Sequence, residues 1–67
     1  MNGERLKQLR KEHKLTQTDL GNKINVTKVS ISGYENGNRS PDTETLTRLA
    51  DYFDVSTDYL LGRSDVR

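Results

Sequence analysis

The chain reads QTDLGNKINVTKVSISGYEN from residue 17 to residue 36, and most of its fold follows from this stretch. Thr16 and Thr27 are residue types that cap helix N-termini, so the pattern predicts one helix over about 17–24 and a second over about 28–35. Two helices joined this closely have to cross steeply. The apolar residues recur where such a pair would face itself and the core: Leu20, Ile24, Val26, Ile31 and Tyr34.

Two small or turn-forming residues support this crossing. Asn25 occupies the sharp turn between the helices, where φ is expected to be positive, and asparagine tolerates that conformation best after glycine. Gly21 lies where the two helices approach each other, so a side chain larger than alanine is expected to hold them apart. The pair Asn36-Gly37 provides the stop of the second helix.

Helical spacing also explains the apolar residues outside this stretch, and no alternation typical of strands occurs. Three further helices are expected, over about 3–13, 43–53 and 57–61. Their N-caps are expected to be Asn2, Asp42 and Ser56. The sequence therefore predicts one compact all-α domain of five helices over residues 1–62, followed by a flexible tail over residues 63–67.

Composition narrows the possible functions. The chain has 67 residues, one histidine and no cysteine, so neither a disulfide nor a thiolate metal cage is available, and no metal site or cofactor is expected. No glycine-rich phosphate loop follows a strand, and so small a core leaves no room for a pocket, so we expect neither an enzyme nor a small-molecule ligand. No apolar run is long enough for a bilayer, which favours a soluble cytoplasmic protein with no membrane contact.

The charge is polarised along the chain although the net charge is only +1. Residues 1–39 hold eight basic and four acidic side chains, a net charge of +4, whereas residues 40–67 have a net charge of −3. Such a distribution suits a protein that presents one end to a polyanion. The alternative is two solvated faces that differ by chance.

Four short segments complete the pattern: Leu15-Thr16-Gln17, Tyr34-Glu35-Asn36-Gly37, Ser40-Pro41, and VSTDYLLG at residues 55–62. With the apolar residues above, they resemble the Xre or lambda-repressor-like helix-turn-helix family of phage and bacterial regulators, which includes the phage repressor and Cro type. The resemblance implies a five-helix DNA-binding domain that places residues 27–36 in the major groove. Asn25 stands where the family usually has glycine, and Gly33 where a polar side chain is common.

The candidates for base contact are the residues of this second helix that do not face the core: Thr27, Lys28, Val29, Ser32 and Gly33. Lys28 can donate to guanine, Val29 can pack on a thymine methyl group, and Ser32 can donate or accept. A nonspecific phosphate contact remains the alternative for Lys28. For Gly33, the groove wall could approach the backbone closely, or the position could make no contact.

Phosphate contacts are expected at both ends of the motif, from Gln17, Thr18, Asn36, Asn38 and Arg39. Gln17 and Thr18 open a helix whose N-terminal amides attract anions, and the resemblance supports Gln17, Asn36 and the loop that follows. Asn36 could equally serve as a helix cap.

Arg10 follows Leu6 by four residues and therefore shares the apolar face of the first helix, where a charge needs a partner. The best candidate is Glu35, and members of the family carry an arginine–glutamate pair at these positions. We expect a structural ion pair that positions the second helix of the motif.

One copy of such a domain contacts a short half-site, so the sequence predicts a homodimer on a pseudo-palindromic operator of double-stranded DNA. By resemblance, the dimer contact is expected at Thr57, Tyr59 and Leu60; alternatively, Tyr59 and Leu60 close the core. The expected function is a sequence-specific transcriptional regulator, with repression favoured because a small domain can block polymerase by occupancy. The alternative is a helical protein-interaction module, such as an antitoxin or anti-repressor.

Overall fold

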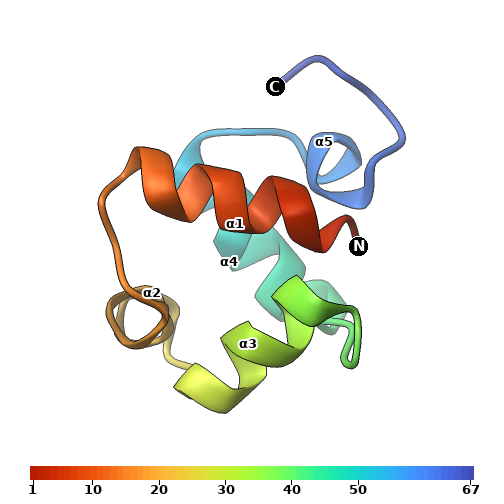
Figure 1. Cartoon of the computed structure of the whole chain (residues 1–67). Helices are drawn as coiled ribbons and strands as arrows, with labels where there is room; N and C mark the ends of the chain where they lie inside the picture. Colours follow the sequence, from red (N-terminus) through yellow and green to blue (C-terminus); the bar gives the residue numbers. More distant parts are fainter.

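The computed structural model describes all 67 residues and contains five helices and no strand. The helices are α1 (Gly3–Glu12), α2 (Gln17–Ile24), α3 (Lys28–Asn36), α4 (Thr43–Phe53) and α5 (Thr57–Leu61) (Figure 1). The all-α prediction is confirmed, and each boundary lies within one residue of the expected position. None of the helices combines the length and the apolar character that crossing a membrane requires.

All five N-caps are the residues that the sequence predicts. The side chains of Asn2, Thr16, Thr27, Asp42 and Ser56 each accept a hydrogen bond from the backbone amide three residues further on. At α2 the cap is reciprocal, because the Asp19 carboxylate also accepts from the Thr16 backbone amide at 3.0 Å. That backbone hydrogen bond lowers the pKa of Asp19 below its ordinary value, with a smaller contribution from the Thr16 hydroxyl. Local sequence therefore sets where each helix begins.

Residues in the left-handed region of the backbone end several of the helices. Asn25 has a φ of 64°, as expected for the turn between α2 and α3, and Gly37 follows α3 with a φ of 81°. Lys14 and Asp54 also have positive φ, at 57° and 55°. Neither was expected, because their side chains carry no signal as clear as that of asparagine or glycine.

The helices enclose one core, and α1 crosses the molecule in front of α4 in the view of Figure 1. Helix α3 packs against α1 and lies below it in this view, and α2 packs against both α3 and α4. The buried apolar residues come from every helix: Leu6, Leu9, Leu20, Ile24, Ile31, Tyr34, Leu49, Ala50, Phe53, Tyr59 and Leu60. This core holds the exposed side of α3 at the surface of the domain.

Two helical glycines mark places where segments approach more closely than a side chain permits. A Cβ atom at Gly21 would lie 2.6 Å from the carbonyl oxygen of Val26, so even alanine is too large there. The close approach at Gly21 is where the sequence predicted it, but the size limit is stricter than predicted, because alanine is already too large. A Cβ atom at Gly3 would collide with the backbone carbonyls of Tyr34 and Glu35, which brings the start of α1 against the end of α3.

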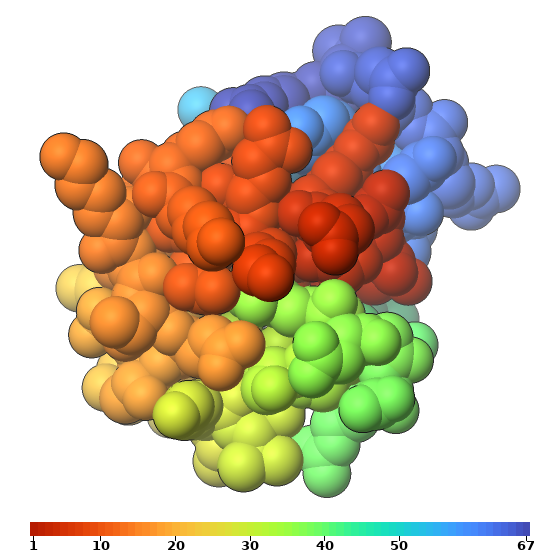
Figure 2. Space-filling view, viewed as in Figure 1, coloured from red at the N-terminus to blue at the C-terminus, as the bar shows by residue number.

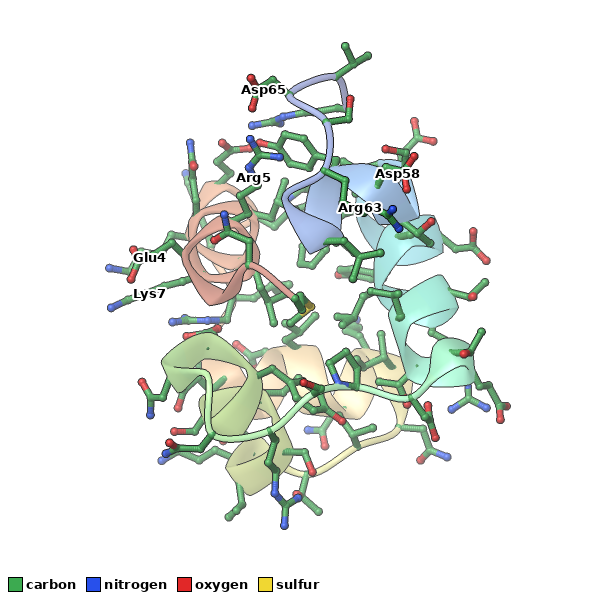
Figure 3. The ribbon with its side chains drawn as sticks, turned by 90° about the vertical axis from the view of Figure 1, so that its right-hand side faces the viewer. Glu4, Arg5, Lys7, Asp58, Arg63 and Asp65 are labelled. Carbon is green, nitrogen blue, oxygen red and sulfur yellow. The ribbon has the colours of Figure 1, made fainter.

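Residues 63–67 turn back over the body of the domain. The Arg67 guanidinium donates two hydrogen bonds to the Glu12 carboxylate, at 2.8 and 3.0 Å, and the Ser56 amide donates to the Arg67 carbonyl at 2.7 Å. Arg5 donates to the carbonyl of Ser64 and pairs with Asp65 (Figure 3). The tail therefore has partners on α1 and before α5 that the sequence analysis did not assign to it.

We expect Gly21→Ala to lower the free energy of unfolding by about 1–3 kcal/mol, because the added methyl group meets a backbone carbonyl that cannot move without displacing the turn. The measurement is urea denaturation followed by circular dichroism. Gly33→Ala is the matched control, since its Cβ atom meets only a flexible arginine side chain. Equal stability of Gly21→Ala and the unmodified chain would contradict the close approach.

Candidate nucleic-acid interface

The outer side of α3 carries most of the side chains that the sequence assigned to base contact. Thr27, Lys28 and Val29 are exposed, Val29 to 68% of its full surface, and Ser32 is half-buried. Figure 2 shows α3 at the lower edge of the molecule, where no other helix covers it on the side seen. The outward orientation agrees with the sequence analysis, and contact with DNA stays a prediction.

A shallow hollow runs along this side of α3 and continues onto the loop that follows it. Its lining residues are Lys28, Val29, Ser32, Gly33, Asn36, Asn38 and Arg39. Only one of them is hydrophobic, and two carry a positive charge, so the hollow is suited to a polar, anionic partner.

Gly33, which the sequence also assigned to base contact, is buried, although it borders the hollow. The aliphatic part of the Arg39 side chain covers it: a Cβ atom at Gly33 would lie 2.9 Å from both Cγ and Cδ of Arg39. The Arg39 guanidinium continues to Ser30, whose hydroxyl accepts a hydrogen bond at 3.1 Å. Gly33 thus gives room to a side chain of the protein itself, a role that the sequence did not indicate. Contact of Gly33 with DNA stays a prediction.

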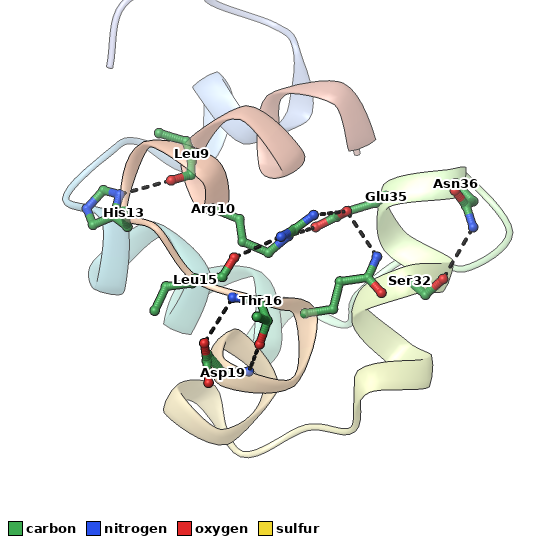
Figure 4. A network of polar contacts seen from close by, with 10 residues as sticks. Leu9, Arg10, His13, Leu15, Thr16, Asp19, Ser32, Glu35 and Asn36 are labelled. Carbon is green, nitrogen blue, oxygen red and sulfur yellow. Dashed lines mark hydrogen bonds and ion pairs between the residues drawn. The ribbon is translucent and has the colours of Figure 1, made fainter.

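The loop after α3 is tied back to the helix. The amides of Asn38 and Arg39 both donate to the carbonyl of Gly33, at 2.9 and 3.1 Å. Asn36 donates from its side chain to the Ser32 hydroxyl at 3.3 Å (Figure 4). Because these two backbone amides are already engaged, contact of this part of the loop with phosphates falls to the exposed side chains of Asn36, Asn38 and Arg39.

The other two phosphate candidates lie at the opposite end of the motif, in the first turn of α2. Thr18 is exposed and makes no hydrogen bond through its side chain, whereas Gln17 is half-buried. The side-chain amide of Gln17 donates to Glu35 Oε1 at 3.2 Å, which positions it at the start of α2.

A buried ion pair connects the last turn of α3 to α1, as the sequence predicted. Arg10 donates from Nε to Glu35 Oε2 at 2.7 Å and from Nη2 to Oε1 at 3.1 Å (Figure 4). Its remaining terminal nitrogen donates to the Leu15 carbonyl at 2.8 Å. The side chains are only 11% and 3% exposed, so the two charges depend on each other for solvation.

The expected dimer contact needs a correction. Leu60 is completely buried and Tyr59 is 7% exposed, so both belong to the core, the alternative that the sequence left open. The guanidinium of Arg5 lies 4.3 Å from the centre of the Tyr59 ring, and that of Arg67 lies 5.5 Å from it. Of the three residues, Thr57 alone keeps part of its surface free.

Comparison with known proteins agrees with this geometry. Residues 6–60 match the family model described as helix-turn-helix. Because the match covers most of the chain and the structure contains the two crossing helices, the chain belongs to the helix-turn-helix family.

Relatives within the family are bacterial and phage proteins. The chain is 44% identical over 64 residues to the HTH-type transcriptional regulator ImmR of Bacillus subtilis, an alignment that covers 96% of this chain and 50% of ImmR. It is 48% identical over 62 residues to the uncharacterized regulator YobD of the same organism, covering 92% of this chain and 55% of YobD. The chain thus spans about half the length of these curated relatives.

A solved structure in the same family shows the fold directly. The c2 repressor of Salmonella phage P22, in complex with a synthetic operator, superimposes with a TM-score of 0.87 at 37% identity, over 92% of this chain and 94% of that one. The resemblance to lambda-type phage repressors is therefore confirmed.

We expect Arg10→Met or Glu35→Gln alone to lower the free energy of unfolding by about 3–5 kcal/mol, because each leaves one buried charge without its partner. The double variant Arg10→Met/Glu35→Gln should lose much less than the sum of the two single changes. Urea denaturation of all three variants measures this difference.

The control for this pair is Glu44→Gln, which removes one partner of the exposed ion pair between Glu44 and Arg48. That change should cost at most about 0.5 kcal/mol. Additive effects at Arg10 and Glu35 would show that the buried pair does not act as a unit.

Proposed function

We propose that this chain is a transcriptional regulator that binds double-stranded DNA sequence-specifically, with α3 in the major groove. The observation that carries the proposal is the outward side of α3, which presents Lys28, Val29 and Ser32 while the opposite side is anchored to α1 by the buried ion pair. A rod held in this way enters a groove without rearrangement of the core. The P22 c2 repressor, which shares the fold, is described in complex with a synthetic operator.

The exposed residues of α3 offer complementary kinds of base contact. The Lys28 ammonium donates to guanine O6 and N7, the Val29 methyl groups pack on a thymine methyl, and the Ser32 hydroxyl donates or accepts. Thr27 has a lesser part, because its hydroxyl already accepts from the Ser30 amide as the N-cap of α3. A mixture of charged, apolar and hydroxyl groups on one helix side gives preference for a particular sequence.

Phosphate contacts flank these base contacts. Gln17 and Thr18 place their side chains at the N-terminus of α2, where free backbone amides attract anions. Asn36 and Asn38 extend from the other end of the motif. With contacts at both ends, the phosphates set the register in which α3 meets the bases.

The regulator acts as a homodimer on a pseudo-palindromic operator and represses by occupying the site. The surface contacted by a single α3 spans too few base pairs for selectivity in a genome, and two copies related by a two-fold axis double it. Because Tyr59 and Leu60 are buried, a second copy would meet the exposed surface around Thr57.

A mobility-shift assay on duplex DNA at two salt concentrations tests the function itself. Binding should weaken steeply as salt rises, because each phosphate that the protein neutralises releases counterion. Lys28→Ala should lose about 1–3 kcal/mol of discrimination at one base pair and keep its affinity for unrelated duplexes. Absence of a shift at low salt would instead favour a protein-interaction module, and an equal loss on every duplex would make Lys28 a phosphate contact.

Sedimentation of the free chain and of the complex tests the assembly. We expect two protomers on each operator, with half-site centres about 34 Å apart along the duplex. A complex that holds one protomer on a duplex containing both half-sites would contradict the dimer.

A further inference from the structure

The Arg39 side chain folds back from the loop after α3 and lies on α3 itself. We propose that Arg39 is a specificity-determining residue that reads a guanine base, and that Gly33 is the positioning residue that makes this possible. The inference rests on the proposed function, since it requires α3 to enter the major groove. It moves Arg39 from the phosphate contacts expected from the sequence to the base contacts.

The position of Arg39 follows from three contacts with α3. Its backbone amide donates to the Gly33 carbonyl at 3.1 Å, its Cγ and Cδ atoms pack over Gly33, and its Nη1 donates to the Ser30 hydroxyl. Ser30 lies in the first turn of α3, so the guanidinium reaches the N-terminal half of the helix. That half is the part of the helix that the proposed docking places deepest in the groove.

The Arg39 guanidinium is free to bind a partner that offers hydrogen-bond acceptors or negative charge. Its bond to Ser30 uses one of five N–H donors, and the fork that remains matches guanine O6 and N7. No carboxylate lies within ion-pair distance of Arg39, whereas Arg5, Arg10, Arg48 and Arg67 each pair with one. Arg39 therefore carries an uncompensated charge on the same hollow as Lys28 and Val29.

The order of this side chain favours a base over a phosphate. A phosphate contact from a loop requires only a charge that reaches outward, and a flexible side chain provides it. Here the side chain lies against the helix and is held at both its stem and its tip, so it moves into the groove together with α3. Such preorganisation lowers the ordering cost of a directional, two-point contact.

Gly33 has a clear role in this arrangement. Glycine is unfavourable inside a helix, and Gly33 lies within α3 and not at a turn, where glycine would be needed for backbone reasons. Any side chain at this position would occupy the space of the Arg39 stem, so the gap left by the missing Cβ atom is what the arginine fills.

The test begins with the complete chain and a duplex library that has a randomised central segment. The enriched duplex and all its single-base-pair variants are then titrated with the unmodified chain, Arg39→Ala, Arg39→Lys and Gly33→Ala. Arg63→Ala is the control, because it removes an exposed arginine that has no carboxylate partner and lies beyond α5 (Figure 3). Circular dichroism and thermal unfolding verify that each variant is folded.

We expect Arg39→Ala to lose discrimination at one G·C pair by about 5-fold to 150-fold, the range of a bidentate arginine–guanine contact. Gly33→Ala should lose discrimination at the same pair although residue 39 is unchanged. Arg39→Lys, which keeps the charge without the planar fork, should also lose it. Arg63→Ala should preserve the full pattern.

Two outcomes would overturn the inference while leaving the proposed function intact. One is an equal loss of affinity of Arg39→Ala for every duplex, together with near-normal binding by Arg39→Lys, which identifies a phosphate contact. The other is unchanged discrimination by Gly33→Ala. If the unmodified chain enriches no duplex at low salt, the proposed function fails, and this inference fails with it.

Discussion

The Glu35 carboxylate is the point on which the arrangement of α1, α2 and α3 depends. It is almost fully buried, and its oxygens accept from Arg10 on α1 and from Gln17 on α2. Arg10 in turn holds the connection between these helices through the Leu15 carbonyl. A buried charge with this many partners tolerates few other geometries, because each displaced helix would leave a charged or polar group without solvation. The orientation of α3 is thereby set from its inner side.

The inner side of α3 packs in the core, and its outer side is exposed to a binding partner. Ile31, Tyr34 and Glu35 are buried, and the exposed set is centred on Val29, which lies about a third of a turn or more from each of the three and is 68% exposed. Because the helical period keeps these two sets apart, residues on the outer side can change without disturbing the core. This separation is why a rigid helix can serve as a recognition element: the energy that holds it in place comes from residues that the partner never touches.

Features that depend on neighbouring residues were predictable from the sequence. The N-caps, the helix limits and the left-handed turn at Asn25 follow from local hydrogen bonding and helical spacing. The need for a partner at Arg10 followed from a charge on an apolar face, and the family resemblance supported Glu35, 25 residues away, as that partner. Contacts between distant segments were not predictable in this way. Burial of Tyr59 depends on how α5 meets α1, and the cover over Gly33 depends on the path of the loop after α3. Neither path leaves a periodic signal in the sequence.

The glycines within the helices are of two kinds, which differ in whether a backbone group or a side chain approaches them. At Gly3 and Gly21 the approaching group is backbone, which has little freedom to withdraw, so these two positions constrain the fold. At Gly33 the approaching group is a flexible side chain, which can move aside at small cost to stability. A glycine of the first kind is required for folding, because the collision raises the energy of the native state itself. A glycine of the second kind is required only if the position of the side chain that it accommodates matters for function.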